Sequence, residues 1–314
     1  MERKCSYDFA KGLAVVWVIF FHTYQLYDAA ILPIVTIMGT LHNPLFFLVS
    51  GILLSKSIGK TSSLGEVLKK KFVGLMGVFI LWTIIETLIY FIVYKPVLSL
   101  GGLIGASFWA VNHLWFFPVL FISSMIVALI HCLKLTRKQQ LLIGIGWIIL
   151  GVIVGLFSTF VCKIVLFSFL VWFGGNVEDN RYGKLYLSIY LCAVAGFILT
   201  TFITYTDNTY PGVKCDIYML IMLLGGIVEY YLVSILPISI LSKKAMCFLG
   251  RNSLYYYVLS PLVLLFNRAQ ISLSIFLIET VLAFAIPTVF VLLFQDSIVD
   301  CVLFKPFKCI HTSN

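Results

Sequence analysis

The sequence predicts an all-α protein, a polytopic membrane helix bundle of about ten transmembrane helices with both termini in the cytoplasm. The first observation behind this prediction is composition, because 61% of the 314 residues are hydrophobic and 11% are charged. Soluble globular domains carry roughly 45–50% apolar and about 25% charged residues. The second observation is that the apolar residues form long continuous runs. The third is that Lys and Arg alternate between the two predicted sides of the membrane.

Ten apolar runs give the predicted spanning helices in order. A helix needs about 20 such residues to cross ~30 Å of hydrocarbon, and only residues 158–159 separate the fifth run from the sixth. Arg3 and Lys4 precede the first run as in a signal peptide, but no small-residue cleavage site follows, so we expect this run to be retained. One domain is predicted over 1–314, with its longest loops at 56–71 and 95–111. The runs are 8–27, 31–55, 72–94, 112–133, 139–157, 159–175, 185–205, 217–240, 251–267 and 272–299.

The basic residues test the number of spans independently. With the N-terminus inside, the inner loops and termini hold 18 of the 22 Lys and Arg residues, and the outer side holds Lys95, Lys163, Lys214 and Arg268. This asymmetry is typical of the positive-inside rule, and a miscounted span would scramble it. The net charge of +9 is spread as small clusters between apolar runs. It therefore does not indicate a nucleic-acid-binding protein.

The eight cysteines do not indicate a metal or redox centre. They include no Cys-x-x-Cys pair, and only the neighbours His131 and Cys132 have the spacing of metal ligands. We therefore expect no bound metal, and we interpret the cysteines as small apolar residues of the helical core.

The first run carries three ionisable residues on one predicted helix face. Asp8, Lys11 and His22 are separated by 3 and 11 residues, a spacing that predicts a polar stripe along the helix. An ionisable group within hydrocarbon costs about 2.5–3.5 kcal/mol, so each is a functional candidate. The alternative is that Lys11 extends to the headgroups and Asp8 caps the helix. For His22, which takes or gives a proton near neutral pH, we favour a functional role.

Two later segments place further polar residues in predicted spans. Asn43 and Pro44 lie inside the second run, where a proline frees a backbone carbonyl and indicates a kinked segment that lines a cavity. His113 opens the fourth run near the outer face, at a depth comparable to that of His22. It is either a functional partner of His22 or an ordinary interfacial anchor.

Three glutamates and two polar clusters complete the candidate residues. The third, eighth and tenth runs contain Glu86, Glu229 and Glu279 respectively. Each needs a partner on another helix, so at least one is expected to face an internal polar cavity. Arg251, Asn252 and Ser253 begin the ninth run, where small and hydroxyl residues also serve as packing contacts. Lys69, Lys70 and Lys71 precede the third run and either anchor the chain to anionic lipid or attract a phosphorylated cofactor.

Four segments recur together in the order of a known family. They are residues 7–14 followed by His22-Thr23, Asn43-Pro44 with the apolar stretch that ends at Gly51, the run His113-Leu114-Trp115-Phe116, and residues 248–254. In combination they resemble the acyltransferase 3 family of integral-membrane acyltransferases, and most closely its fucose 4-O-acetylase-like branch. The resemblance spans nearly the whole chain.

The resemblance implies a multi-pass enzyme of the bacterial cell membrane. Such an enzyme transfers an acyl group, usually acetyl from acetyl-CoA, to a sugar hydroxyl of an envelope polysaccharide or its lipid-linked precursor. It implies a catalytic role for His22, with Lys11 in the same motif, and importance for Lys69, Lys70 and Lys71. On this basis we expect His22 either to act as general base on the acceptor hydroxyl or to carry the acetyl group transiently, and His113 to position the substrate or a proton. We expect the four lysines to bind the donor. We expect a supporting polar network of Asp8, Asn43, Glu86, Arg251, Asn252 and Ser253.

The chain also departs from the family. Relatives commonly have arginine where this chain has Lys11 and arginines within the basic segment, and many have histidine where it has Ser260. The alternative functions are a secondary transporter or flippase, in which buried ions form a relay, and a structural subunit of a polysaccharide-assembly complex. The chain shows no internal repeat and no matched pair of interrupted helices, which argues against the transporter.

Overall fold

The computed structural model describes residues 5–26, 43–58, 63–94, 100–133, 135–155, 159–176, 225, 227–228, 240–264 and 273–305. All regular structure in these ranges is helical, as predicted. The helices are α1 (Cys5–Leu26), α3 (Pro44–Ile58), α4 (Leu64–Tyr94), α5 (Leu100–His113), α6 (Phe116–Cys132), α7 (Arg137–Gly155), α8 (Thr159–Asn176), α11 (Ile240–Arg251), α12 (Ser253–Leu264), α13 (Leu273–Phe294) and α14 (Ile298–Phe304).

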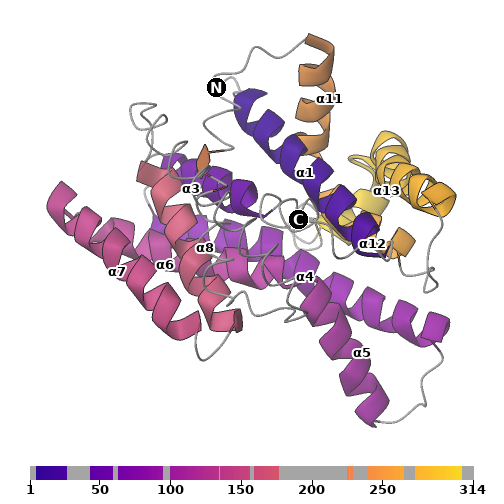
Figure 1. Cartoon of the computed structure of the whole chain (residues 1–314), viewed down its shortest axis with the longest axis horizontal. Helices are drawn as coiled ribbons and strands as arrows, with labels where there is room; N and C mark the ends of the chain where they lie inside the picture. Colours follow the sequence, from indigo (N-terminus) through magenta and orange to yellow (C-terminus); the bar gives the residue numbers. More distant parts are fainter. Residues whose placement is uncertain are drawn as a thin grey trace, which may run out of the picture.

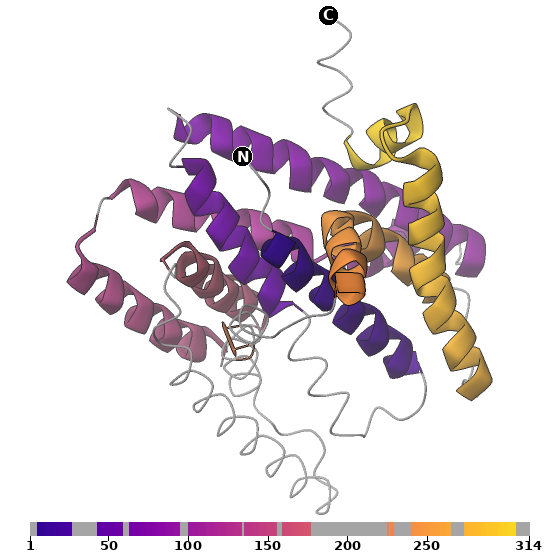
Figure 2. The same cartoon turned by 90° about the horizontal axis from the view of Figure 1, so that it is seen from above.

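The helices pack in two groups that α4 and α1 connect. One group contains α3, α6, α7 and α8, and the other contains α1, α11, α12 and α13 (Figure 1). Helix α1 also packs against α3, whereas α4 packs against α5 and α6. Figure 2 shows α4 along one edge of the molecule with α14 beside it. The buried core is apolar, and it includes Phe47, Leu114, Phe117, Phe167 and Tyr256.

Helix α4 presents one face of large apolar side chains to the exterior. Ile80, Ile84, Leu88 and Ile92 follow one another at every fourth position and are 49–73% exposed, whereas Glu86 on the other side is fully buried. Exposed apolar surface of this extent marks contact with a membrane or a partner. Within the described ranges, Leu64–Val93 and Ile275–Phe294 are long and apolar enough to cross a bilayer, and three shorter apolar helices accompany them. The total of ten spans and the side of the termini stay predictions.

Several helix boundaries differ from the predicted runs. The predicted loops at 56–71 and 95–111 are largely helical, because α4 begins at Leu64 and α5 occupies Leu100–His113. Pro44 is the first residue of α3, where a missing N–H leaves no bond unmade. The part of the second run that precedes Asn43 lies outside the described residues, so the predicted kink within that run stays a prediction. The fifth and sixth runs correspond to α7 and α8. The seventh run lies outside the described residues, as does most of the eighth.

Local sequence explains where particular helices begin. Thr136 and Gln139 form a reciprocal pair ahead of α7, since the Thr136 amide donates to the Gln139 side chain at 2.9 Å and the Gln139 amide donates to the Thr136 hydroxyl at 3.5 Å. This is a capping box. Ser297 caps α14 by accepting a hydrogen bond from the Asp300 amide at 3.3 Å.

The cysteines differ in chemical state. Cys162 is buried and Cys132 exposed, and both are free thiols. Cys247 is also buried, as expected for a small core residue. However, Cys247 and Cys301 each take part in a disulfide bond, so the interpretation of all eight cysteines as simple core residues is wrong for these two.

Candidate functional site

The first and last of the four motifs meet where α1 crosses α11. A Cβ atom at Gly12 would lie 2.7 Å from the carbonyl carbon of Met246, and one at Gly250 would lie 2.6 Å from the carbonyl carbon of Asp8. Real Cβ contacts are essentially never this short. The two glycines therefore allow the helix backbones to touch, as small residues do at helix crossings in membranes.

This crossing places a buried carboxylate beside a guanidinium. Asp8 is only 1% exposed, and the Nε of Arg251 donates to its Oδ2 at 3.3 Å. The Arg251 side chain is 57% exposed, so the pair connects the interior to the surface. The structure thus brings together two members of the predicted polar network.

Cationic side chains gather near the same end of α1. Lys71 of α4 is half-buried and interacts electrostatically with Lys11, whereas Lys69 and Lys70 are exposed. All three lysines of the basic run lie within α4 rather than in a loop, which corrects the prediction. Two ammonium groups held near each other repel, and a bound anion relieves that repulsion. Of the four predicted donor-binding lysines, the structure therefore pairs Lys11 with Lys71.

Lys56 is a further cation in this region, and it was not among the predicted site residues. The Lys56 ammonium donates to the Tyr7 hydroxyl at 2.5 Å and lies 4.6 Å from the centre of its ring. Tyr7 directly precedes Asp8 on α1. The available signal was the position of Lys56 at the predicted cytoplasmic end of the second run, but a pairing between helices cannot be read from that position alone.

The two histidines occupy different helices. His22 is half-buried on α1, with its ring centre 5.3 Å from that of Phe21. The next residue, Thr23, is fully buried and donates to the Ile19 carbonyl at 2.8 Å. His113 is the last residue of α5 and not the opening of the spanning helix α6, which corrects its predicted place. Its side chain lies outside the described atoms, so the predicted partnership with His22 stays a prediction.

The motif asparagines organise helix ends. The carbonyl of Asn43 accepts from the amides of Phe46 and Phe47 at 3.0 and 3.4 Å, which starts α3. Asn252 separates α11 from α12, and its side-chain nitrogen donates to the Phe248 carbonyl at 3.0 Å. Both asparagines are buried. Besides their predicted role in a polar network, both asparagines therefore shape the ends of helices. Ser253 is the first residue of α12.

Aromatic residues of the second and third motifs pack with Tyr257, which follows the fourth motif, into one cluster. The Phe116 ring lies 5.1 Å from Phe47 and 5.0 Å from Tyr257, and Phe117 lies 5.2 Å from Tyr257. The Tyr257 hydroxyl is hydrogen-bonded to the backbone of Phe116 and interacts electrostatically with Glu86. Glu86 is thus a predicted interior glutamate that faces this cluster. Glu279 is also buried, whereas Glu229 lies outside the described residues.

Ser260 has a structural explanation. It is buried in α12, and its hydroxyl donates to the Tyr256 carbonyl one turn earlier at 2.5 Å. The Tyr256 hydroxyl in turn shares a 2.5 Å hydrogen bond with Thr288 of α13. A narrow apolar gap beside Tyr256 and Tyr257 connects this region to α1, where Val15 and Ile19 line it.

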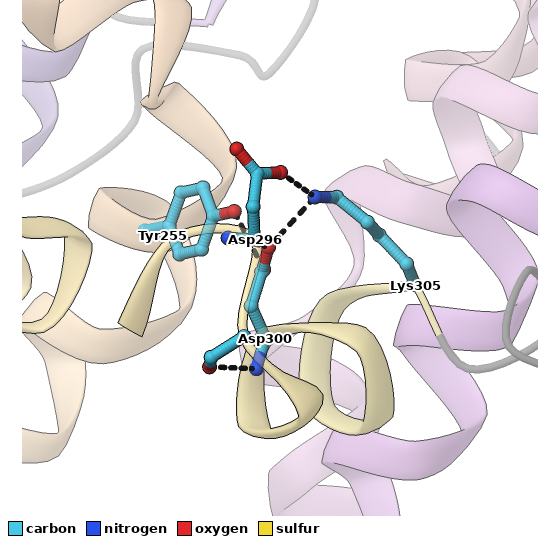
Figure 3. Close-up of polar contacts among 5 residues, drawn as sticks. Tyr255, Asp296, Asp300 and Lys305 are labelled. Atoms are coloured by element: carbon cyan, nitrogen blue, oxygen red, sulfur yellow. Dashed lines mark hydrogen bonds and ion pairs between the residues drawn. The ribbon is translucent and has the colours of Figure 1, made fainter. Parts of the chain in front are cut away.

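A second polar cluster, which sequence reasoning missed, fastens α14 to α12 (Figure 3). The fully buried Asp300 carboxylate accepts from the Tyr255 hydroxyl and the Lys305 ammonium, both at 2.6 Å, and from the Asp296 amide at 2.9 Å. Asp296 adopts a left-handed backbone conformation with φ of 62°, which aspartate tolerates. Burial acts to raise the pKa of Asp300, but these hydrogen bonds and the Lys305 charge outweigh it and hold the pKa below its ordinary value.

These features define a helical membrane protein whose interior holds acidic groups and whose N-terminal helix gathers cations. The model of the acyltransferase 3 family, described as an acyltransferase domain, matches residues 6–296. The chain therefore belongs to this family and is a membrane acyltransferase. No curated protein and no solved structure matches the chain. Of the Asp300 cluster, Asp300 and Lys305 lie beyond the matched residues, whereas Tyr255 and Asp296 lie within them.

Proposed function

We propose that the protein is a multi-pass O-acetyltransferase of the bacterial cell membrane. In this proposal it moves acetyl from cytoplasmic acetyl-CoA to a sugar hydroxyl of an envelope polysaccharide or its lipid-linked precursor, as in the fucose 4-O-acetylase-like branch. One domain over 1–314, with ten spans and both termini in the cytoplasm, carries out the reaction. The family match supports an enzyme over the alternative of a transporter or flippase.

The observation that carries the proposal is the arrangement along α1. Lys11 lies near one end of the helix with Lys71 close by, and the Arg251–Asp8 pair and Lys56 occupy the same end. His22 follows eleven residues later, about 16 Å along the axis at 1.5 Å per residue. Anionic groups of a donor are attracted to the cationic end. An extended thioester arm then leads along the helix toward the imidazole.

His22 acts as the general base in this mechanism. It takes the proton of the acceptor hydroxyl while the hydroxyl oxygen attacks the thioester carbonyl carbon, and the carbon–sulfur bond then breaks. The new bond is an ester, and the CoA thiolate leaves and takes up a proton. A positioned base contributes about 10²–10⁴ in rate, which matters because a sugar hydroxyl is a weak nucleophile at neutral pH. His113 positions the acceptor in this scheme.

Mass analysis of surface glycan tests the proposal. Cells that carry the gene should show glycan with the mass of added acetyl groups that mild alkali removes, and cells without it should not. His22→Ala should abolish the added mass at an unchanged level of protein in the membrane. Phe21→Leu, a change at the adjacent half-buried position, is the matched control and should retain it. Normal acetylation by His22→Ala would remove His22 from the mechanism, and glycan of identical mass in the presence and absence of the gene would refute the proposed function.

A further inference from the structure

A cavity of about 180 Å³ lies between the C-terminal ends of α3, α6 and α8 and the first turns of α7. It is separate from the aromatic cluster that joins the motifs. The lining residues that matter here are Ser55, His131, Gln140, Trp172, Gly175 and Asn176. A cavity of this volume has room for one heterocyclic ring system, though not for a whole coenzyme molecule.

The wall of the cavity combines an aromatic face with fixed polar groups. Trp172 is half-buried and packs against Phe169 and Trp147, with ring centres 5.6 and 6.2 Å apart. The side-chain nitrogens of Gln140 and Asn176 donate to backbone carbonyls at 3.2 and 2.8 Å, which orients both amides. Their amide oxygens are acceptors suited to an exocyclic amino group. Few polar groups on a largely apolar and aromatic wall are typical of small-molecule sites.

Helix packing fixes the shape of this cavity. A Cβ at Gly51 would lie 2.7 Å from the carbonyl carbon of Val171, and one at Gly174 would lie 3.0 Å from that of Leu48, so α3 and α8 are in backbone contact. Gly175 follows directly, and its missing side chain leaves space opposite Ser55. The cavity is therefore formed by a rigid crossing, which suits a preformed binding site.

The cavity adjoins the cationic end of α1. Ser55 lines it, and the next residue is Lys56, whose ammonium reaches Tyr7 of α1. A ligand with an aromatic ring in the cavity and phosphates attached to that ring would therefore bring its charges toward Lys56. The donor of the proposed function has this chemistry, since its adenine carries an amino group and is linked through a ribose to phosphates.

We propose that the cavity beside Trp172 binds the adenine ring of the acetyl-CoA donor, with the attached phosphates near Lys56. This inference rests on the proposed function. Stacking of a base on an aromatic side chain is worth about 1–3 kcal/mol by alanine substitution, and 1.4 kcal/mol corresponds to a tenfold change in binding. The adenine subsite therefore contributes about tenfold or more to donor affinity.

A comparison of two donors tests the inference with the full-length protein in membranes or detergent. The KM is measured for acetyl-CoA and for S-acetyl-4′-phosphopantetheine, which carries the same thioester arm without the adenosine. Trp172→Leu should raise the KM for acetyl-CoA about tenfold or more and leave that of the truncated donor unchanged, whereas Trp172→Phe should restore most of the affinity. Trp147→Leu is the matched control, because Trp147 packs on Trp172 without lining the cavity.

Ser55→Leu keeps the test decisive where Trp172→Leu does not accumulate in the membrane. It fills the cavity from the α3 side and should discriminate against acetyl-CoA in the same way. An equal rise in KM for both donors, or no rise for either, would overturn the adenine subsite while leaving the acetyltransferase intact. A wild-type protein that transfers acetyl from neither donor would instead refute the proposed function, and the subsite with it.

Discussion

Gly12→Ala should destabilise the protein, although alanine is the better helix former. At an open helical position this change gains roughly 0.5–1 kcal/mol. At Gly12 the new Cβ would lie 2.7 Å from the Met246 carbonyl carbon, at least 0.7 Å short of the 3.4 Å at which ordinary contact begins. The obstacle is backbone, so α1 and α11 must separate, and overpacking of this kind costs about 1–3 kcal/mol. The separation also lengthens the contact between Asp8 and Arg251, because Arg251 lies on the displaced helix.

Thermal unfolding of the purified protein in detergent, followed by tryptophan fluorescence, measures this effect. Gly74→Ala is the matched control, since a Cβ at Gly74 meets nothing within 4 Å. We expect a lower apparent Tm for Gly12→Ala and an unchanged or higher one for Gly74→Ala. If Gly12→Ala unfolds at or above the wild-type temperature, the close crossing of α1 and α11 is wrong, and the placement of Asp8 beside Arg251 is wrong too.

Three further changes follow from the polar contacts. Asp300→Ala leaves a buried tyrosine hydroxyl without its acceptor, costs about 1–3 kcal/mol, and should speed hydrogen exchange in α14. In the wild type the Asp300 pKa lies below the ordinary 3.8, so its contribution is present above that pH and disappears as acid protonates the folded carboxylate. A protection factor in α14, which is the intrinsic exchange rate divided by the observed one, that stays unchanged from pH 7 to 2 would contradict this. Lys71→Gln should raise the KM for acetyl-CoA more than the exposed Lys69→Gln, and equal effects would count against donor binding beside Lys11. Arg251→Ala should lower stability in detergent by about 1 kcal/mol, with Arg251→Lys partly restoring it, because a buried carboxylate loses a half-exposed partner.

The pattern of hydrophobic residues predicted the all-α fold class, because a bilayer restricts the backbone structures that can cross it. Within a bilayer no water is present to hydrogen-bond the backbone, so a long run of apolar residues must form a helix that satisfies its own N–H and C=O groups. Even the short polar interruption between the fifth and sixth runs corresponds to the end of α7 at Gly155 and the start of α8 at Thr159. The exposed faces of α4 and α13 agree with this interpretation. The same signal carries no information on helices that continue past the apolar run.

The predicted helix boundaries were wrong where polar residues that favour helices extend a helix beyond its apolar run. Lysine has a high helix propensity, so the run from Lys69 to Lys71 continues α4 toward Leu64 instead of forming a loop. Pro44 was assigned to a helix interior because it falls within the apolar run 31–55, yet proline fits the first turn best, and α3 begins at Pro44. Helix α11 occupies the predicted loop between the eighth and ninth runs, and Asn252 separates it from α12, because its backbone ends one helix and begins the next.

The candidate site was predicted only in part, for a physical reason. Helical periodicity places Asp8 and Lys11 on one helix, but it cannot identify their partners on other helices. Arg251 and Lys71 lie far away in sequence, and their approach depends on the crossings of α11 and α4 with α1. The Asp300 cluster was missed because Asp296 lies at the polar end of the last apolar run and Asp300 follows that run, where a sequence offers no sign of burial.

The attachment of α14 has a consequence for how this protein moves. The Trp82 indole of α4 donates to the Leu303 carbonyl at 2.9 Å, and the Tyr255 hydroxyl of α12 holds Asp300. One short segment thereby ties α4 and α12 together at a single corner. We expect the contact of α14 with α4 and α12 to stay fixed during turnover. Any opening for substrates should then occur on the side of the protein away from α14.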